Sequence, residues 1–192
     1  MKELVFATNN KHKLQEVQQI VGAKFKIVSL AELGCNDEIP ETASTLEGNS
    51  LMKAQYIHDK YKVDCFADDT GLEIEALNGR PGVYSARYAG EHCSFQDNIN
   101  KILQQMQGIE NRKAKFRTVI TLILDNRIHY FEGFVNGVIT KTQVGMSGFG
   151  YDPVFIPQNY TETFAEMNAE EKNIISHRGM ATRKLAAFLT EL

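Results

Sequence analysis

The chain has 192 residues, a formal net charge of −3 and a hydrophobic fraction of 43%. This length fits one domain, 1–192, with two lobes at most, and the composition excludes a disordered or collagen-like chain. The small negative charge provides no broad basic surface, so we expect no nucleic-acid partner. Every apolar run is far shorter than the roughly 20 residues of a membrane helix, so we expect no membrane association.

The amino terminus and the cysteines bear on the cellular compartment. Residues 1–8 carry an early acid and a strand-like apolar run, which is not the pattern of a secretory signal. Cys35, Cys65 and Cys93 are widely spaced and include no CxxC pair for zinc or redox chemistry. They are interpreted as reduced, buried thiols of a cytoplasmic protein.

The first third of the chain alternates strand and helix patterns. Residues 3–8 predict a strand buried on both faces, and 13–21 predict a helix because their apolar residues recur at helical spacing. A short strand is expected at 25–29. Residues 30–45 are rich in turn-forming residues and are interpreted as a long loop, followed by a helix at 46–61.

The rest of the chain adds a strand hairpin to this alternation, which indicates an α/β fold with a mixed sheet. The expected elements are a strand at 63–67 that ends in Asp68-Asp69-Thr70-Gly71, a strand at 72–76, a turn at 78–82, a helix at 94–107, hairpin strands at 115–124 and 128–140, a glycine-rich loop at 145–152, a strand at 153–156, and a helical region at 168–192 with a break at 176–179.

Two segments of the first half combine residues suited to phosphate and metal binding. Residues 8–13, Thr-Asn-Asn-Lys-His-Lys, lie where a strand leads into a helix, and a helix N-terminus offers unpaired N–H groups to a phosphate. Helix capping by the asparagines is the alternative. The adjacent acids Asp68 and Asp69 follow an apolar strand, where a hard cation such as Mg²⁺ would offset their repulsion and desolvation. An acidic turn is the alternative there.

Three further groups carry polar or aromatic side chains that could join such a site. Glu41 precedes a helix on which Asn49 and Lys53 share one face, although an exposed, solvated face is the better explanation of this pair taken alone. Residues 148–153 place two aromatic rings and an acid in a glycine-rich loop, where rings could stack on a nucleobase or belong to the core. Lys172 and residues 176–179, Ser-His-Arg-Gly, supply hydrogen-bond donors at a helix break.

In combination these segments resemble the inosine/xanthosine triphosphate pyrophosphatase family. The resemblance runs from Thr8 to Arg183. Its motifs are Thr8-x-Asn10-x-x-Lys13, Glu41-Thr42, Asn49-x-x-x-Lys53-Ala54, Ala67-Asp68-Asp69-Thr70-Gly71-Leu72, Pro81-Gly82-Val83-Tyr84-Ser85-Ala86-Arg87, Phe149-Gly150-Tyr151-Asp152-Pro153, and Lys172 with Ser176-His177-Arg178-Gly179.

The resemblance implies hydrolysis of ITP, dITP and XTP to the monophosphate and pyrophosphate, with Mg²⁺ as cofactor. It makes Asp69 the proton acceptor and, with Glu41, a metal ligand. The other implied catalytic residues are Asp68, Lys13 and Lys53. The implied substrate contacts are Thr8, Asn9, Asn10, Lys11, His12, Lys13, Thr70, Phe149, Gly150, Tyr151, Asp152, Lys172, Ser176, His177 and Arg178.

The family fold is an elongated, two-lobed mixed sheet with flanking helices and a cleft between the lobes, and its usual assembly is a homodimer. Asn9 replaces a common glycine, and Gly48 stands where many relatives carry glutamate. Three other functions are open from the sequence: a pyrophosphatase for other modified nucleotides, a non-catalytic nucleotide sensor, and a scaffold protein. The sequence also leaves open which of Asp68 and Asp69 is the base.

Overall fold

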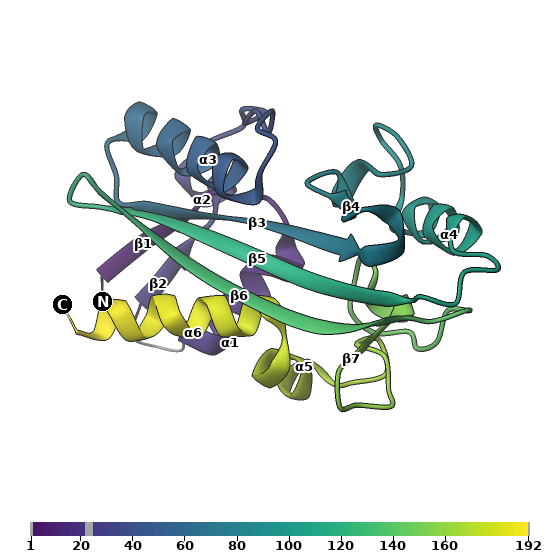
Figure 1. Ribbon diagram of the computed structural model, residues 1–192. Helices are drawn as coiled ribbons and strands as arrows, with labels where there is room; N and C mark the ends of the chain where they lie inside the picture. Colours follow the sequence, from purple (N-terminus) through teal and green to yellow (C-terminus); the bar gives the residue numbers. More distant parts are fainter. Residues whose placement is uncertain (1, 22–24, 192) are drawn as a thin grey trace. The chain divides into compact units, whose positions relative to one another are not determined.

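The computed structural model describes residues 2–21 and 25–191. Over these residues the chain forms a seven-stranded sheet in the order β2-β1-β3-β5-β6-β7, with β4 paired to β3 outside this path (Figure 1). Strands β1, β2 and β3 are parallel neighbours, whereas β4 and β7 pair antiparallel. The predicted α/β fold with a mixed sheet is confirmed.

The elements follow one another in the predicted order. They are β1 (Lys2–Phe6), α1 (Lys11–Val21), β2 (Phe25–Val28), α2 (Leu30–Leu33), α3 (Leu46–Tyr61), β3 (Cys65–Ile74), η2 (Glu75–Leu77), β4 (Arg80–Gly82), η3 (Ser85–Arg87), α4 (Phe95–Gln105), β5 (Lys113–Leu124), β6 (Arg127–Ile139), η4 (Asp152–Val154), β7 (Phe155–Pro157), α5 (Ala169–Ile175) and α6 (His177–Thr190). The last residue of the predicted terminal helix, Leu192, lies outside the described residues.

Several sequence-based boundaries are wrong; the expected turn at 78–82, for example, contains β4. The expected loop at 30–45 begins with helix α2, which Ser29 caps through a reciprocal contact with Glu32 and which Gly34 ends in a left-handed conformation. The expected strand end at Asp68-Asp69 is instead the middle of β3. Asp and Gly favour turns, but the strand continues here because both of its faces are buried and both carboxylates have polar partners, Lys13 and Asn49.

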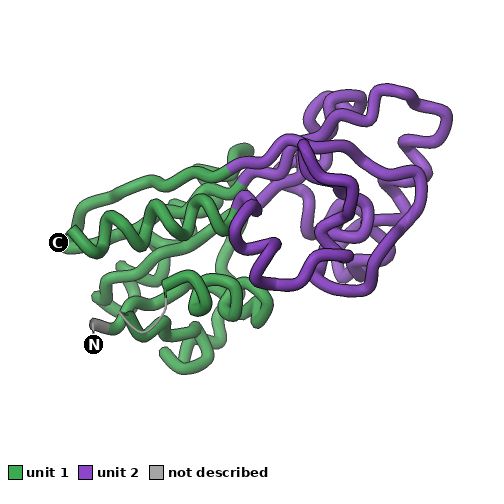
Figure 2. The backbone as a smooth tube through the Cα atoms, turned by 90° about the horizontal axis from the view of Figure 1, so that it is seen from below, with its two compact units in different colours: residues 1–69, 118–133, 178–192 green, residues 70–117, 134–177 purple. Residues whose placement is uncertain are grey.

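The described chain divides into two compact units (Figure 2). Unit 1 comprises residues 1–69, 118–133 and 178–192, and unit 2 comprises 70–117 and 134–177. Within these ranges, no helix of the described residues is long and apolar enough to cross a membrane.

The sheet of unit 1 is covered on both faces, which explains why β1 is apolar at successive positions. Leu4 and Phe6 pack with residues of α1 and α6 on one face, and Val5 and Ala7 pack with residues of α3 on the other. Figure 1 shows α3 on one side of these strands and α1 and α6 on the opposite side. The ring of Phe6 stacks on that of Phe66 with centroids 4.4 Å apart. The predicted doubly buried strand is confirmed.

Unit 2 has its own core, built around aromatic rings. Phe116 of β5 lies 4.6 Å from Phe155 of β7, centroid to centroid, and Phe164 packs against both rings. Ile102 of α4 and Met106, directly after this helix, belong to the same core. The three cysteines are free thiols; Cys35 and Cys65 are buried as expected, but Cys93 is only half-buried.

Candidate active site

The two adjacent acids of β3 point to opposite faces of the sheet. Successive side chains of a strand alternate, so Asp68 lies on the face of Phe66 with α1 and α6, and Asp69 lies on the face of Ala67 with α3. The crowding expected from their sequence adjacency is thereby relieved. Each acid has its own set of partners, and these partners give the two carboxylates different chemistry.

Asp68 is held between two cations. Lys13 Nζ lies 2.7 Å from its Oδ1, and Arg178 Nε lies 3.1 Å from its Oδ2. Only 1% of the Asp68 side chain is exposed. Burial opposes ionisation, but Lys13 and Arg178 outweigh it and hold the pKa of Asp68 well below its usual range. Asp68 therefore remains a carboxylate with both oxygens engaged.

The contacts of Asp69 stabilise its negative charge less than the contacts of Asp68 do. Asn49 Nδ2 donates to its Oδ2 over 3.1 Å, and Lys53 Nζ lies 3.8 Å from its Oδ1. Burial raises the pKa of Asp69 above its usual value, partly offset by Lys53 and Lys13. A carboxylate with a raised pKa is the better proton acceptor, because it gains more from protonation. The geometry thus separates a fixed anion, Asp68, from a candidate base, Asp69.

Lys53 joins Asp69 to the segment that precedes α3. Its Nζ lies 2.7 Å from Oε1 of Glu41 as well as 3.8 Å from Asp69. Asn49 is fully buried and Lys53 is 6% exposed, so the interpretation of this helix face as solvated is wrong. Glu41 and Asp69, distant in sequence, therefore lie around one ammonium group.

The loop before α1 combines capping with exposed polar side chains. Oδ1 of Asn10 accepts from the N–H groups of His12 and Lys13, at 3.0 and 3.3 Å, so the asparagine caps the helix. Thr8 Oγ1 accepts from the N–H of Asn10. Asn9, Lys11 and His12 are exposed. Asn10 therefore caps α1, as the alternative interpretation expected. Lys13 of the same turn contacts a buried acid, Asp68.

Unit 2 holds a second cluster around Lys172. Its Nζ lies 2.8 Å from Oδ2 of Asp152 and 4.8 Å from the centroid of the Phe149 ring. The same Asp152 oxygen accepts from the N–H of Phe149 over 2.9 Å. Asp152 and Lys172 are almost completely buried. The carboxylate therefore fixes both the cation and the loop that carries the aromatic ring.

The remaining predicted contacts of unit 2 are less exposed than a substrate pocket would suggest. Tyr151 is buried and its hydroxyl donates to the carbonyl of Ser85 over 2.6 Å. His177 is buried and its ring stacks on Phe116 with centroids 4.6 Å apart. Ser176 is buried at the end of α5, Thr70 is half-buried in β3, and Gly150 adopts a left-handed turn conformation. Their substrate roles remain predictions.

Two residues of these clusters were missed by sequence reasoning. Glu16 lies 2.5 Å from Arg178 NH1, and the ring of Phe116 stacks on that of His177. The position of Glu16, three residues after Lys13 on a predicted helix, could have indicated a shared face. The contact of Phe116 joins distant segments, which no local pattern signals.

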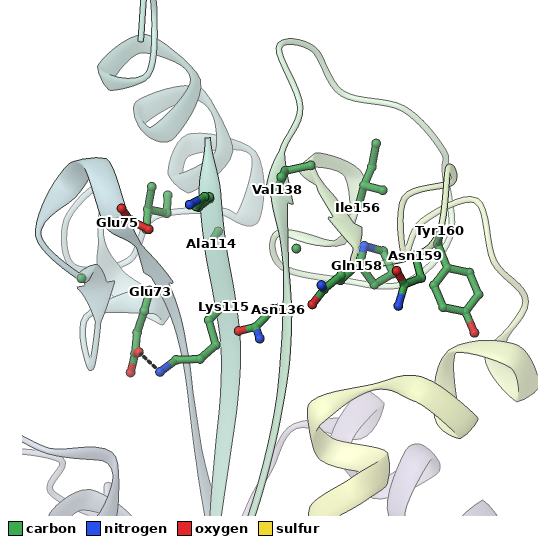
Figure 3. Close-up of a pocket in the computed structure, with 15 residues that line it drawn as sticks. Glu73, Glu75, Ala114, Lys115, Asn136, Val138, Ile156, Gln158, Asn159 and Tyr160 are labelled. Atoms are coloured by element: carbon green, nitrogen blue, oxygen red, sulfur yellow. Dashed lines mark ion pairs between the residues drawn. The ribbon is translucent and has the colours of Figure 1, made fainter. Parts of the chain in front are cut away.

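A separate hollow of about 700 Å³ lies in unit 2. Figure 3 shows Glu73 and Lys115, an ion pair at 3.0 Å, on one side of it and Gln158 and Asn159 on the other. None of its fifteen lining residues belongs to the predicted site. The predicted residues gather elsewhere: Lys13, Glu41, Lys53, Asp68, Asp69 and Arg178 in unit 1, and Phe149, Asp152 and Lys172 in unit 2.

Comparison with known proteins identifies the group to which this arrangement belongs. A model of the Ham1 family matches residues 4–188, almost the whole chain. The chain belongs to the Ham1 family. Among its Ham1 relatives, the dITP/XTP pyrophosphatase of Porphyromonas gingivalis is 54% identical over 190 residues and that of Flavobacterium psychrophilum 53% over 186. The alignments cover 97–98% of this chain and 98% of each relative.

Solved Ham1 structures share the fold. The Ham1 protein of Staphylococcus aureus superposes with a TM-score of 0.90 at 38% identity, covering 99% of both chains. The HAM1 protein of Coxiella burnetii gives 0.92 at 36% identity, covering all of both chains. The expected family and fold are therefore confirmed.

Proposed function

We propose that this Ham1 protein hydrolyses deaminated purine nucleoside triphosphates (dITP, ITP and XTP) to the monophosphate and pyrophosphate. The carrying observation is the placement of Lys53 between Glu41 and Asp69 in a chain more than half identical to proteins named dITP/XTP pyrophosphatase. Carboxylates gathered with lysines suit phosphoryl chemistry, which depends mainly on positioning and on stabilisation of charge.

In this proposal Asp69 accepts a proton from the attacking water. The water oxygen forms a bond to the α-phosphorus, the bond from this phosphorus to the bridging oxygen breaks, and pyrophosphate leaves. The raised pKa of Asp69 favours this role, whereas Asp68 is held ionised by Lys13 and Arg178. Asp68 instead positions these two cations.

The cations of unit 1 bind the phosphates. Lys13 and Lys53 lie beside carboxylates that fix their positions, so little reorganisation is needed as negative charge grows on the leaving pyrophosphate. The N-terminal turn of α1 adds N–H groups and the positive end of the helix dipole. In this proposal residues 8–13 therefore bind the triphosphate.

Glu41 and Asp69 are the residues that would hold Mg²⁺. They converge on one positive charge, the ammonium of Lys53, so this region already favours a cation. No cluster of three His, Cys, Asp or Glu ligands occurs among the described residues. Two carboxylates completed by phosphate oxygens and waters nevertheless fit the oxygen shell of Mg²⁺. When bound, the ion would neutralise and polarise the phosphates.

The cluster of unit 2 would bind the base. The ring of Phe149 offers a stacking face, and its position is fixed through Asp152 and Lys172. Hypoxanthine and xanthine present a 6-oxo acceptor where adenine presents a 6-amino donor. A donor such as Lys172, His177 or a backbone N–H would face the 6-amino donor if adenine bound, and unpaired buried polar groups are costly. We expect discrimination against ATP of at least about a hundredfold.

Three finer properties stay predictions. The family resemblance suggests a homodimer, the reduced thiols suggest a cytoplasmic location, and the lack of a basic surface argues against a nucleic-acid partner. The alternative functions differ in substrate range and in turnover. A pyrophosphatase for other nucleotides would share the acids of unit 1 but not this base preference, and a nucleotide sensor would bind without releasing pyrophosphate.

The test is pyrophosphate release from dITP, XTP, dGTP and dATP, with Mg²⁺ and with EDTA. We expect one pyrophosphate per monophosphate formed, no orthophosphate, and turnover of dITP and XTP only with the cation. Equal kcat/KM values for dITP and dATP would contradict the base assignment. Release of orthophosphate and a diphosphate would contradict attack at the α-phosphorus.

A further inference from the structure

Four charged side chains of unit 1 form one buried chain of alternating sign. It runs from Lys13 to Asp68, from Asp68 to Arg178, and from Arg178 to Glu16, with contacts of 2.7, 3.1 and 2.5 Å. The exposed fractions of these side chains lie between 1% and 15%. Two cations and two anions balance each other, so these four side chains together carry no net charge.

Glu16 is the last member of this series of ion pairs, and Lys13 is the first. It lies on α1 three residues after Lys13, so both side chains extend from the same part of one helix. The guanidinium of Arg178 is divided between two acids, with Nε on Asp68 and NH1 on Glu16. Nε of Arg178 donates to Oδ2 of Asp68, and Oδ1 of Asp68 accepts from Lys13.

We propose that Glu16 is a positioning residue for phosphate binding. A guanidinium carries its N–H donors in one rigid plane, so a carboxylate that holds one of them also fixes the direction of the others. By holding NH1, Glu16 fixes the orientation of the guanidinium, so that its Nε meets Oδ2 of Asp68 while Oδ1 holds Lys13. This role rests on the proposed function, in which Lys13 binds the polyphosphate.

The variant Glu16→Gln tests the charge at constant size. Glutamine keeps the volume of the side chain, so a role in packing alone would survive the substitution. Loss of the charge would weaken the contact that holds NH1, so the guanidinium could turn away from Oδ2 of Asp68, and the carboxylate that fixes Lys13 would shift. We expect affinity for inorganic pyrophosphate, measured by calorimetry, and kcat/KM for dITP each to fall about tenfold, as for loss of a charged hydrogen bond.

Two further variants separate this role from general destabilisation. Glu16→Asp keeps the charge and should bind pyrophosphate better than Glu16→Gln. Glu3→Gln removes the exposed pair of Glu3 with Lys26 in the same unit and should leave affinity and activity unchanged. In a Lys13→Met background, Glu16→Gln should have little further effect, because the group that it positions is absent.

The proposal is overturned if Glu16→Gln binds pyrophosphate as the native chain does, or if its effect persists undiminished without Lys13. Pyrophosphate binding does not require turnover. Failure of the native chain to hydrolyse dITP would therefore count against the proposed function and would leave the comparison of Glu16 variants decisive.

Discussion

The side-chain amide of Asn49 donates a hydrogen bond of 3.1 Å to Oδ2 of Asp69 from the buried face of α3. Its Oδ1 accepts from the N–H of Ala43 over 2.9 Å. One amide thus ties the candidate base to the segment that follows Glu41. Burial raises the pKa of Asp69, and the hydrogen bond from Asn49 acts with Lys53 and Lys13 to lower it.

Replacement of Asn49 by aspartate should move the pH dependence of turnover. A second carboxylate facing Asp69 would raise its pKa further, since like charges disfavour ionisation. Asp69 must be ionised to accept a proton, so activity falls as the pH falls through its pKa. The acid limb of the kcat profile for Asn49→Asp should therefore lie at higher pH than that of the native chain or of Asn49→Ala. Superimposable acid limbs would contradict the role of Asp69.

Replacement of Asp68 by asparagine should destabilise the fold. It leaves Lys13 and Arg178 beside a neutral group, and breaking a buried ion pair costs about 3–5 kcal/mol. The folded pKa of Asp68 is depressed, so its contribution is present above the unfolded value of about 3.9 and is lost as the pH falls further. Urea unfolding at pH 7 and below pH 4 should show a large and then a shrinking difference from the native chain.

The exposed pair of Glu3 and Lys26 is the matched control for Asp68. Both side chains are more than half exposed, and exposed ion pairs contribute little to stability. Glu3→Gln should therefore change the free energy of unfolding by much less than Asp68→Asn. Equal losses would mean that the buried contacts of Asp68 do not stabilise unit 1.

Much of this arrangement could be predicted from the sequence because it depends on local patterns. Hydrophobic spacing located α3, and the apolar run before Asp68 located the first half of β3. The predicted end of that strand was wrong. Asp and Gly favour turns, and only contacts with Lys13 and Asn49, distant in sequence, show that Asp68 and Asp69 remain within β3.

The burial of Lys53 could not be predicted for the same reason. On a helix surface Asn49 and Lys53 read as solvated, since lysine is rarely buried unless it is paired. Its partners Glu41 and Asp69 come from a loop and a strand whose positions the helix pattern does not reveal. Family motifs pointed to these residues, and the three-dimensional structure supplies the physical reason.

Replacement of Lys172 by methionine should weaken substrate binding more than turnover. The change preserves length but removes the cation that joins Asp152 to the Phe149 ring. Because this cluster is proposed to hold the base, we expect the KM for dITP to rise about tenfold and kcat to change by less. A normal KM with reduced kcat would instead assign Lys172 to the chemical step.

Replacement of Gly148 by alanine tests how closely Asp152 is packed in unit 2. An added Cβ would overlap the Asp152 carboxylate, in a backbone with φ of +77°. Gly79 has nearly the same φ, +78°, with no atom within 4 Å of an added Cβ. Both alanines suffer the left-handed penalty of about 1 kcal/mol, so only Gly148→Ala should lower Tm further. Equal Tm values for Gly148→Ala and Gly79→Ala would show that the loop around Gly148 shifts to accommodate the added Cβ.

The most direct test of the account is kcat of Asp69→Asn with dITP and Mg²⁺. Burial raises the pKa of Asp69, so its charge costs stability at neutral pH and asparagine should not unfold the chain. Loss of the base predicts a fall in kcat of about a hundredfold or more. Turnover close to that of the native protein, with an unchanged circular dichroism spectrum, would contradict proton acceptance by Asp69.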